Sequence, residues 1–262
     1  MIATFRNVII AAAAVAGVTG TALAETAPQP VKNVVLVHGA FADGSGWRGV
    51  YDQLTARGYR VSIVQNPLTS LADDVAATQR VLARQDGPVI LVGHSYGGTV
   101  ITEAGNDPKV AGLVYVAALA PDSGESTGDQ FAQIPAPKGF VIEPQADNFG
   151  FVNLATFKAG FAADVSDADA AFMRDSQVPI AMSAFGDKVG IAAWHAKPSW
   201  FVVATQDGAI DPKLLRATAK KIGAVTEEIE GSHVVFLSQP KAVADVIDRA
   251  AQDALTKGAA SN

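Results

Sequence analysis

The stretch VILVGHSYGGTV, residues 89–100, constrains the fold more than any other part of the chain. Four apolar residues lead into the motif GHSYG at 93–97, and an apolar pattern resumes at Thr99. A buried strand that turns sharply into a helix needs small residues on both sides of the turn, because the two elements approach closely. The glycines meet that need. The serine at the apex, Ser95, is predicted to have a strained backbone and a hydroxyl raised above the carboxyl end of a sheet, as a nucleophile requires.

Apolar runs alternate with helical patterns on both sides of this motif, and the strands read as apolar on both faces. Such strands are typical of a parallel sheet covered by helices, so we predict an α/β fold with a mostly parallel sheet of about six strands and helices on both faces. The expected strands are 33–37, 59–64, 89–92, 110–116, 200–204 and 225–229. The expected helices are 47–57, 71–83 with Ser70 as N-cap, 99–105, 212–222 and 240–255.

The segment 121–198 interrupts the alternation. It holds most of the chain's phenylalanines, and four prolines interrupt any long helix. We predict a cap inserted into a domain that spans 33–262. It either packs over the sheet as a plain excursion or also lines a pocket with its apolar underside, as ligand sites commonly require.

The first 24 residues have the layout of a secretory signal: one cation at Arg6, a short apolar run and small residues before position 25. We predict cleavage after Ala24, a linker at 25–32, and a mature protein that is periplasmic or secreted without stable membrane association. A retained membrane anchor is the alternative, although glycines and alanines make the run poorly suited to span a bilayer.

Composition excludes several classes of function. The formal net charge is -6 and no block of Lys and Arg occurs, so nucleic acid is not an expected partner. Cysteine is absent, which removes disulfides, thiolate zinc sites and a cysteine nucleophile. No zinc-protease or nucleotide-binding glycine motif is present, so we expect no metal and no cofactor.

A serine nucleophile needs a base and an orienting carboxylate. His233 is the favoured base, because it lies in the loop after the last strand, whereas His94 adjoins the serine and is expected only to pack beside it. The segment WFVVATQDGAIDP offers two acids after a strand. Asp207 is favoured, because Asp211 precedes a proline and suits a helix N-cap.

A tetrahedral intermediate also needs two hydrogen-bond donors for its oxyanion. The backbone N–H of Tyr96, at the start of a helix, is one expected donor. The loop HGAFADGSGW supplies the other through the N–H of Ala40, with the Phe41 N–H as a fallback. We further expect the Phe41 side chain to contact the substrate.

Five motifs together resemble the α/β-hydrolase superfamily, in the branch of methyl-salicylate-type esterases, hydroxynitrile lyases and bacterial relatives. They are VLVHGAFADGSGW, VILVGHSYGG, VYVAALAPDSGES, PSWFVVATQDGAIDP and GSHVVFLSQP, in that order from residue 34 to about 247. The resemblance implies an α/β-hydrolase fold with a cap, a triad of Ser95, Asp207 and His233, and oxyanion donors at Ala40 and Tyr96.

The resembled branch contains two chemistries and some non-catalytic receptors. Its lyases place a hydroxyl or amide side chain after the first-loop histidine, and one subgroup places a lysine after the catalytic histidine. This chain has Gly39 and Val234 at those positions. Both differences favour ester hydrolysis, and with the signal-like first 24 residues they lead us to predict a secreted serine hydrolase of small carboxylic esters. Cyanohydrin cleavage and ligand binding without turnover remain the alternatives.

Overall fold

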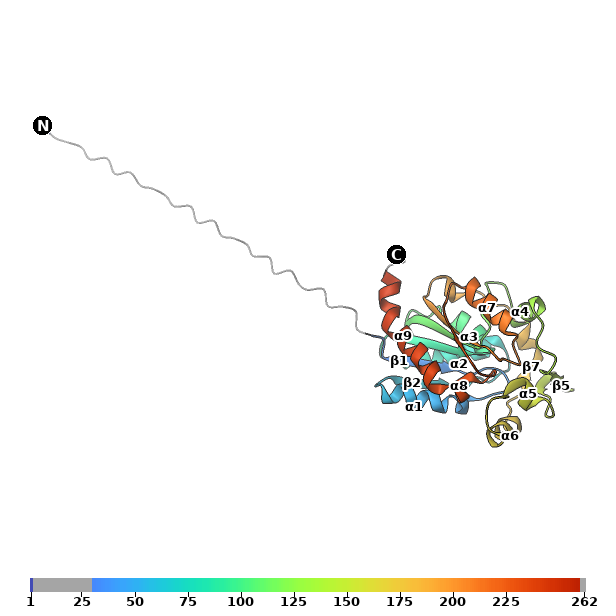
Figure 1. Ribbon diagram of the computed structural model, residues 1–262. Helices are drawn as coiled ribbons and strands as arrows, with labels where there is room; N and C mark the ends of the chain where they lie inside the picture. Colours follow the sequence, from blue (N-terminus) through green and yellow to red (C-terminus); the bar gives the residue numbers. More distant parts are fainter. Residues whose placement is uncertain (2–29, 260–262) are drawn as a thin grey trace.

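The computed structural model describes residue 1 and residues 30–259, so the predicted signal peptide and most of the linker lie outside the described residues. Its centre is a six-stranded sheet of order β2-β1-β3-β4-β8-β9 in which every neighbouring pair is parallel (Figure 1). The strands are β1 (Asn33–Val37), β2 (Arg60–Val64), β3 (Val89–His94), β4 (Val110–Val116), β8 (Ser199–Ala204) and β9 (Val225–Ile229). The predicted fold class and strand count are confirmed.

The expectation that all strands are apolar on both faces is wrong at the sheet edges. Strands β1, β3 and β8 are buried along their whole length, but β9 is largely exposed. Its polar positions contact cations from helices instead: Glu228 pairs with Arg216 and Glu227 with Arg249. An edge strand has a neighbour on one side only, so its side chains are covered incompletely.

Helices surround the sheet, with α1 packed against α9 and α2 against α3. They are α1 (Arg48–Ala56), which follows the short helix η1 (Gly44–Trp47), α2 (Leu71–Ala83), α3 (Gly97–Ala104), α7 (Pro212–Lys221), α8 (Val235–Ser238) and α9 (Pro240–Ala259). The Asp73 N–H donates to Ser70 Oγ at 3.1 Å, so the predicted cap of α2 is confirmed. None of the helices within residues 30–259 combines the length and apolar character that crossing a bilayer requires.

A long excursion separates β4 from β8 and covers the carboxyl end of the sheet (Figure 1). It contains a small antiparallel sheet of order β5-β6-β7 and several short helices. Its elements are α4 (Thr127–Gln133), β5 (Ile142–Pro144), β6 (Phe149–Val152), α5 (Phe157–Phe161), α6 (Asp167–Asp175), β7 (Ile180–Ala181), η2 (Met182–Phe185) and η3 (Ala193–His195). We call this excursion the cap.

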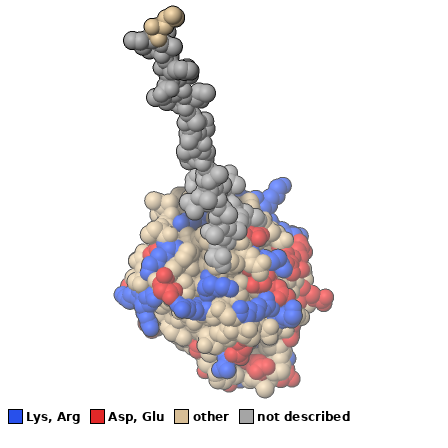
Figure 2. Space-filling view, turned by 90° about the vertical axis from the view of Figure 1, so that its left-hand side faces the viewer, with Lys and Arg blue, Asp and Glu red and all other residues tan. Residues whose placement is uncertain are grey.

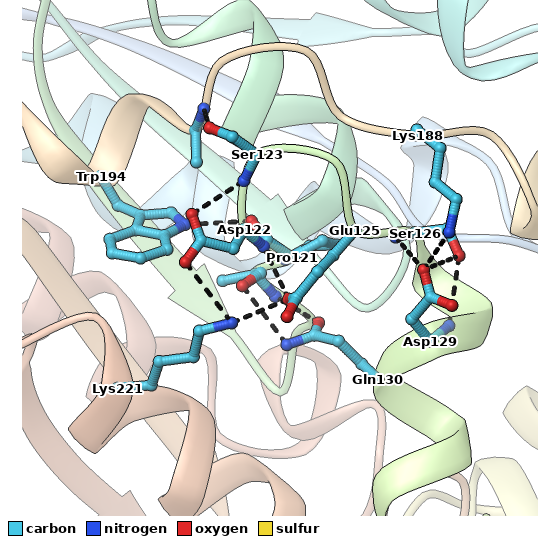
Figure 3. Close-up of polar contacts among 12 residues, drawn as sticks. Pro121, Asp122, Ser123, Glu125, Ser126, Asp129, Gln130, Lys188, Trp194 and Lys221 are labelled. Atoms are coloured by element: carbon cyan, nitrogen blue, oxygen red, sulfur yellow. Dashed lines mark hydrogen bonds and ion pairs between the residues drawn. The ribbon is translucent and has the colours of Figure 1, made fainter.

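The two ends of the cap are tied together (Figure 3). The Trp194 indole N–H, near the end of the cap, donates to the Pro121 carbonyl at its beginning, at 3.1 Å. Lys221 of α7 pairs with Glu125 at 2.7 Å and lies 3.8 Å from Asp122. These contacts fix the base of the cap to the sheet domain, so its interior elements are held over the strand ends.

Candidate active site

Ser95 sits at the turn between β3 and α3 in a left-handed backbone conformation, with φ of 54°. A non-glycine residue there is strained, and such strain is typical of functional positions. A Cβ added to Gly98 would lie 2.2 Å from the Leu119 carbonyl, and one on Gly93 would lie 2.5 Å from the Gly97 carbonyl. The strained turn and the need for glycines are as the sequence predicts.

The structure brings Ser95, His233 and Asp207 together although they are far apart in the chain. Ser95 Oγ lies 2.9 Å from His233 Nε2, and His233 Nδ1 lies 2.8 Å from Asp207 Oδ2. His233 and Asp207 are only 1% and 4% exposed. Because a carboxylate only accepts, Nδ1 carries the proton and Nε2 is free to accept one from the serine.

Asp207 is itself held by the turn after β8. Its second oxygen, Oδ1, accepts from the backbone N–H groups of Ala209 and Ile210, both at 2.8 Å. Asp211 does not join the site. It accepts from the Lys213 N–H at 2.8 Å and caps α7, which is the N-cap role expected for it. The turn after β8 therefore directs Asp207 toward His233 and leaves Asp211 to cap the next helix.

Ala40, Phe41 and Tyr96 are buried and line the space above Ser95. Within residues 30–259, none of their backbone N–H groups donates to a protein acceptor. Buried N–H groups are nearly always paired, so unpaired donors beside a serine can accommodate an anion, and this holds for the expected donors Ala40 and Tyr96 and for the fallback, Phe41.

The peptide that carries the Ala40 N–H is oriented by a buried histidine. The Asn66 N–H donates to His38 Nε2 at 2.9 Å, which leaves the proton on Nδ1 to donate to the Gly39 carbonyl at 2.9 Å. In a trans peptide the N–H points opposite to the carbonyl, so the Ala40 N–H is turned away from His38. Burial lowers the pKa of His38, which keeps this arrangement neutral.

His94 packs beside the elbow, as expected, but it also has a contact that the sequence did not reveal. Its Nε2 donates to the backbone carbonyl of His233 at 2.9 Å, and the two rings lie 4.6 Å apart. Burial, and then the neighbouring His233, holds the pKa of His94 well below its ordinary value. A neutral His94 therefore holds the backbone of His233, whose Nε2 contacts Ser95 Oγ.

Asp74 of α2 is fully buried and holds the side chain of Tyr96, the residue after Ser95. Its carboxylate accepts from the Tyr96 hydroxyl at 3.0 Å and from the Leu68 N–H at 2.8 Å. Burial raises its pKa from 3.8 to about 6; the two hydrogen bonds oppose the rise, whereas Asp73 and Asp187 add to it. Sequence reasoning missed this residue, because a carboxylate in the first turn of a helix is ordinary.

The raised pKa of Asp74 predicts a stability that falls as pH rises from about 4 to about 6. In that range the unfolded chain loses the proton first, so the folded state is penalised, by up to about 3 kcal/mol. In Asp74→Asn the amide keeps one hydrogen-bond acceptor and adds a donor, but it does not titrate. The free energy of unfolding of this variant should therefore lack the pH-dependent loss between about pH 4 and pH 6. Urea unfolding of the wild type and of Asp74→Asn at pH 4 and pH 7 measures how much unfolding free energy each protein loses as the pH rises. Equal losses in the two proteins would contradict a raised pKa for Asp74.

Asp164, in the cap, holds the loop that carries His233. It accepts from the Ser232 N–H at 2.9 Å and from the hydroxyls of Ser232 and Ser238. A Cβ on Gly231 would lie 3.0 Å from the same carboxylate. Burial raises the pKa of Asp164, but the hydrogen bonds from the two serines outweigh it and leave the pKa below its ordinary value. Nothing in the local sequence indicated this long-range contact.

Asp164→Ala is expected to lower kcat on a small ester by about tenfold, because small displacements of a catalytic group are costly. Asp169→Ala is the matched control. Asp169 belongs to the same part of the cap, but it contacts Ser166 at the start of α6 and not the histidine loop. Its loss should cost only about 1 kcal/mol of stability. Equal kcat values for the two variants would show that Asp164 does not position His233.

The cavity directly above Ser95 is small and apolar, at ≈ 20 Å³. The predicted contact residue, Phe41, lines it together with aromatic side chains of the cap, namely Phe131, Phe140, Phe161 and Phe185. Among the described residues, no three His, Asp or Glu side chains are grouped closely enough to hold a metal ion. The arrangement suits attack by a serine on an uncharged carbonyl in a largely dry chamber.

Comparison with known proteins agrees with this geometry. The family model described as "Alpha/beta hydrolase family" matches residues 34–246. The chain belongs to the α/β-hydrolase family. A pyrethroid hydrolase from Sphingobium faniae JZ-2 has the same fold as this α/β-hydrolase, with a TM-score of 0.71 at 22% identity over 84% of this chain and 97% of that one.

Two further relatives match this α/β-hydrolase over shorter stretches. A pyrethroid hydrolase of Sphingobium wenxiniae is 39% identical over 104 residues, 34% of this chain and 36% of the relative. A carbendazim hydrolyzing esterase of Nocardioides sp. is 34% identical over 108 residues, 36% of this chain and 45% of the relative. The matched regions thus span less than half the length of these two relatives.

Proposed function

We propose that this α/β-hydrolase cleaves small carboxylic esters through an acyl-enzyme on Ser95. The observation that carries the proposal is the unbroken chain of contacts from Asp207 through His233 to Ser95, beside two buried N–H donors. Similarity to a pyrethroid hydrolase and to a carbendazim hydrolyzing esterase supports hydrolysis of this kind.

The geometry supports the following sequence of steps. His233 Nε2 takes the Ser95 proton as Oγ bonds to the ester carbonyl carbon, and Asp207 stabilises the imidazolium. The N–H groups of Ala40 and Tyr96 stabilise the oxyanion, each typically by about 3 kcal/mol. The imidazolium then gives its proton to the leaving alkoxide. Water, deprotonated by the same imidazole, attacks the acyl-enzyme, and the imidazolium returns the proton to Ser95 Oγ as the bond to the acyl group breaks, which releases the acid and free Ser95.

The lyase alternative receives no support from the first loop. A Cβ placed on Gly39 would lie 2.7 Å from Ser95 Cβ and 2.9 Å from the His94 carbonyl, so a side chain there would displace the nucleophile. Val234, after the histidine, is fully buried and apolar. These two positions therefore offer neither a side-chain partner for a cyanohydrin hydroxyl nor a cation for cyanide.

The deciding experiment treats the purified protein with a fluorophosphonate probe and measures turnover of an aryl acetate and of mandelonitrile. We expect labelling at Ser95, ester turnover and no cyanide release. Cyanide release at a rate comparable to ester turnover would favour the lyase. Tight binding of an ester with negligible hydrolysis would favour a receptor.

We also propose that the protein is exported and works on small molecules alone. The signal-like layout of residues 1–24 supports export, and mass spectrometry of the mature N-terminus tests it, with Glu25 as the expected first residue. Lys and Arg are interspersed with Asp and Glu on the face shown in Figure 2, and the formal net charge of -6 supports the view that nucleic acid is not a partner.

A further inference from the structure

Thr127 of α4 adds a hydroxyl to the chamber above Ser95 that the proposed reaction does not use. Among the described residues that line this chamber, the other polar side chains are those of Ser95, His233 and Tyr96, and the Tyr96 hydroxyl already donates to Asp74. Thr127 itself is fully buried. A ligand can therefore reach it from the chamber but not from the protein surface.

The hydroxyl of Thr127 meets that of Thr99, and this pair has one proton more than its hydrogen bond uses. The two Oγ1 atoms lie 2.8 Å apart, and either can be the donor. Each hydroxyl carries one proton, so the bond between them uses one proton and leaves the other without an acceptor. Within residues 30–259, neither hydroxyl makes a further hydrogen bond. A ligand that brings an acceptor can use the spare proton.

The surroundings of the two hydroxyls decide which of them offers the spare proton to a ligand. Thr99 is fully buried in α3 and does not line the chamber, whereas Thr127 does. A hydroxyl proton rotates to suit its neighbours. When an acceptor enters the chamber, the arrangement that pairs both protons has Thr99 donating to Thr127 and Thr127 donating to the ligand.

Thr127 is held in place by the start of α4. Ser126 and Asp129 form a capping box there: Ser126 Oγ accepts from the Asp129 N–H at 3.2 Å, and Asp129 Oδ2 accepts from the Ser126 N–H at 2.8 Å (Figure 3). The Gln130 side chain bonds the N–H and the carbonyl of Ala120, at 2.9 Å and 3.3 Å. A donor fixed in this way loses little freedom when it binds an acceptor.

The chamber limits the kind of acceptor that it can receive. Among the described residues that line it there is no Asp, Glu, Lys or Arg other than those outside its wall, and most of the wall is aliphatic or aromatic. A charged substituent would lose its hydration there without gaining an ion pair, so a neutral acceptor is favoured. The volume of ≈ 20 Å³ has room for about one water molecule, which leaves no space for water between a substituent and the Thr127 hydroxyl.

We infer that Thr127 determines specificity by donating a hydrogen bond to a neutral acceptor, such as an ether oxygen, on the part of the ester that the chamber encloses. This inference rests on the proposed ester hydrolysis and adds the class of substrate to it: esters that carry a second acceptor near the scissile carbonyl. An ester with a methylene group in that place would leave the Thr127 proton unpaired, and this loss is the source of the discrimination.

Two pairs of esters that differ by one oxygen test the inference. Ethyl methoxyacetate and ethyl butyrate differ in the acyl half, and 2-methoxyethyl acetate and butyl acetate differ in the alcohol half. For each pair, the ratio of kcat/KM for the ether ester over the alkyl ester is measured by pH-stat in the wild type and in Thr127→Val. Comparing ratios between the two proteins cancels the intrinsic reactivity of the esters. We expect the ratio to fall about tenfold in Thr127→Val for at least one pair.

Three further variants separate the hydroxyl from its surroundings. Thr127→Ser keeps the hydroxyl and should keep the wild-type ratio. In Thr99→Val the Thr127 proton remains, so the ratio should also be kept. Thr102→Val is the matched control: Thr102 is another buried threonine of α3, but it donates to the Gly98 carbonyl and does not line the chamber. Its ratio should not change.

The outcomes that overturn the inference are distinct from failure of the proposed function. Ratios for both pairs that are unchanged in Thr127→Val, or that fall equally in Thr102→Val, would show that Thr127 has no part in specificity. A ratio that rises in Thr99→Val alone would show that Thr127 donates to Thr99 and not to substrate. A wild type that hydrolyses none of the four esters would contradict the proposed function, and the inference with it.

Discussion

Ser95→Ala is expected to lower kcat for a small aryl acetate by about 10⁶-fold and to abolish fluorophosphonate labelling. In the proposed reaction, Ser95 Oγ is the atom that bonds to the carbonyl carbon. Its hydroxyl also supplies the proton that His233 takes, and alanine at position 95 has neither. The remaining rate should reflect the N–H donors of Ala40 and Tyr96, which alanine at position 95 leaves in place. Initial-rate measurements with concentrated enzyme determine the residual turnover.

Ser70→Ala is the control for this variant. Ser70 is also a serine at the start of a helix, but its hydroxyl caps α2 and lies outside the chamber. Its loss should cost about 1 kcal/mol of stability with turnover retained. If Ser95→Ala kept substantial turnover while remaining folded, the nucleophile would have to be assigned elsewhere.

Asp207→Asn is expected to lower kcat by about 10⁴-fold. Asp207 Oδ1 accepts two backbone N–H groups, so the amide oxygen of an asparagine would keep that place and its NH₂ would face His233 Nδ1. Since the amide only donates at that position, the imidazole proton would move to Nε2. A protonated Nε2 cannot accept the Ser95 proton, so the variant should fold normally and react slowly.

Asp211→Asn is the matched change four residues later. Asparagine is as good an N-cap as aspartate, so we expect turnover within a factor of about two and a small change in unfolding free energy. Both kcat and the thermal transition should be measured for the pair. A large loss of turnover in Asp211→Asn, with little in Asp207→Asn, would exchange the two assignments.

Much of the fold was predictable because it depends on short-range patterns. The runs at 34–37 and 110–116 are apolar throughout, and the strands that contain them, 33–37 and 110–116, have the predicted bounds. Ser70 and Asp211 capped their helices, since a cap depends only on the next two or three residues. The edge strand β9 departed from the pattern because its pairing on one side only is a property of the whole sheet.

The candidate site divides in the same way. Ser95, with its flanking glycines, and the choice of Asp207 over Asp211 depended on local turns that the sequence specifies. The roles of Asp74 and Asp164 did not, because each contacts residues that are distant in the chain and ordinary in their own segments.

The sequence by itself determined the alternation of strands and helices, the strained serine turn and the residue types able to activate it. Only the tertiary structure decided that the imidazole of His233 reaches the Ser95 hydroxyl and that Asp164, a carboxylate of the cap, holds the loop that carries this histidine. The physical reason is the distance along the chain over which each interaction acts. Backbone strain and capping act within a few residues, whereas contacts between segments exist only once the parallel sheet has brought its strand ends to one edge.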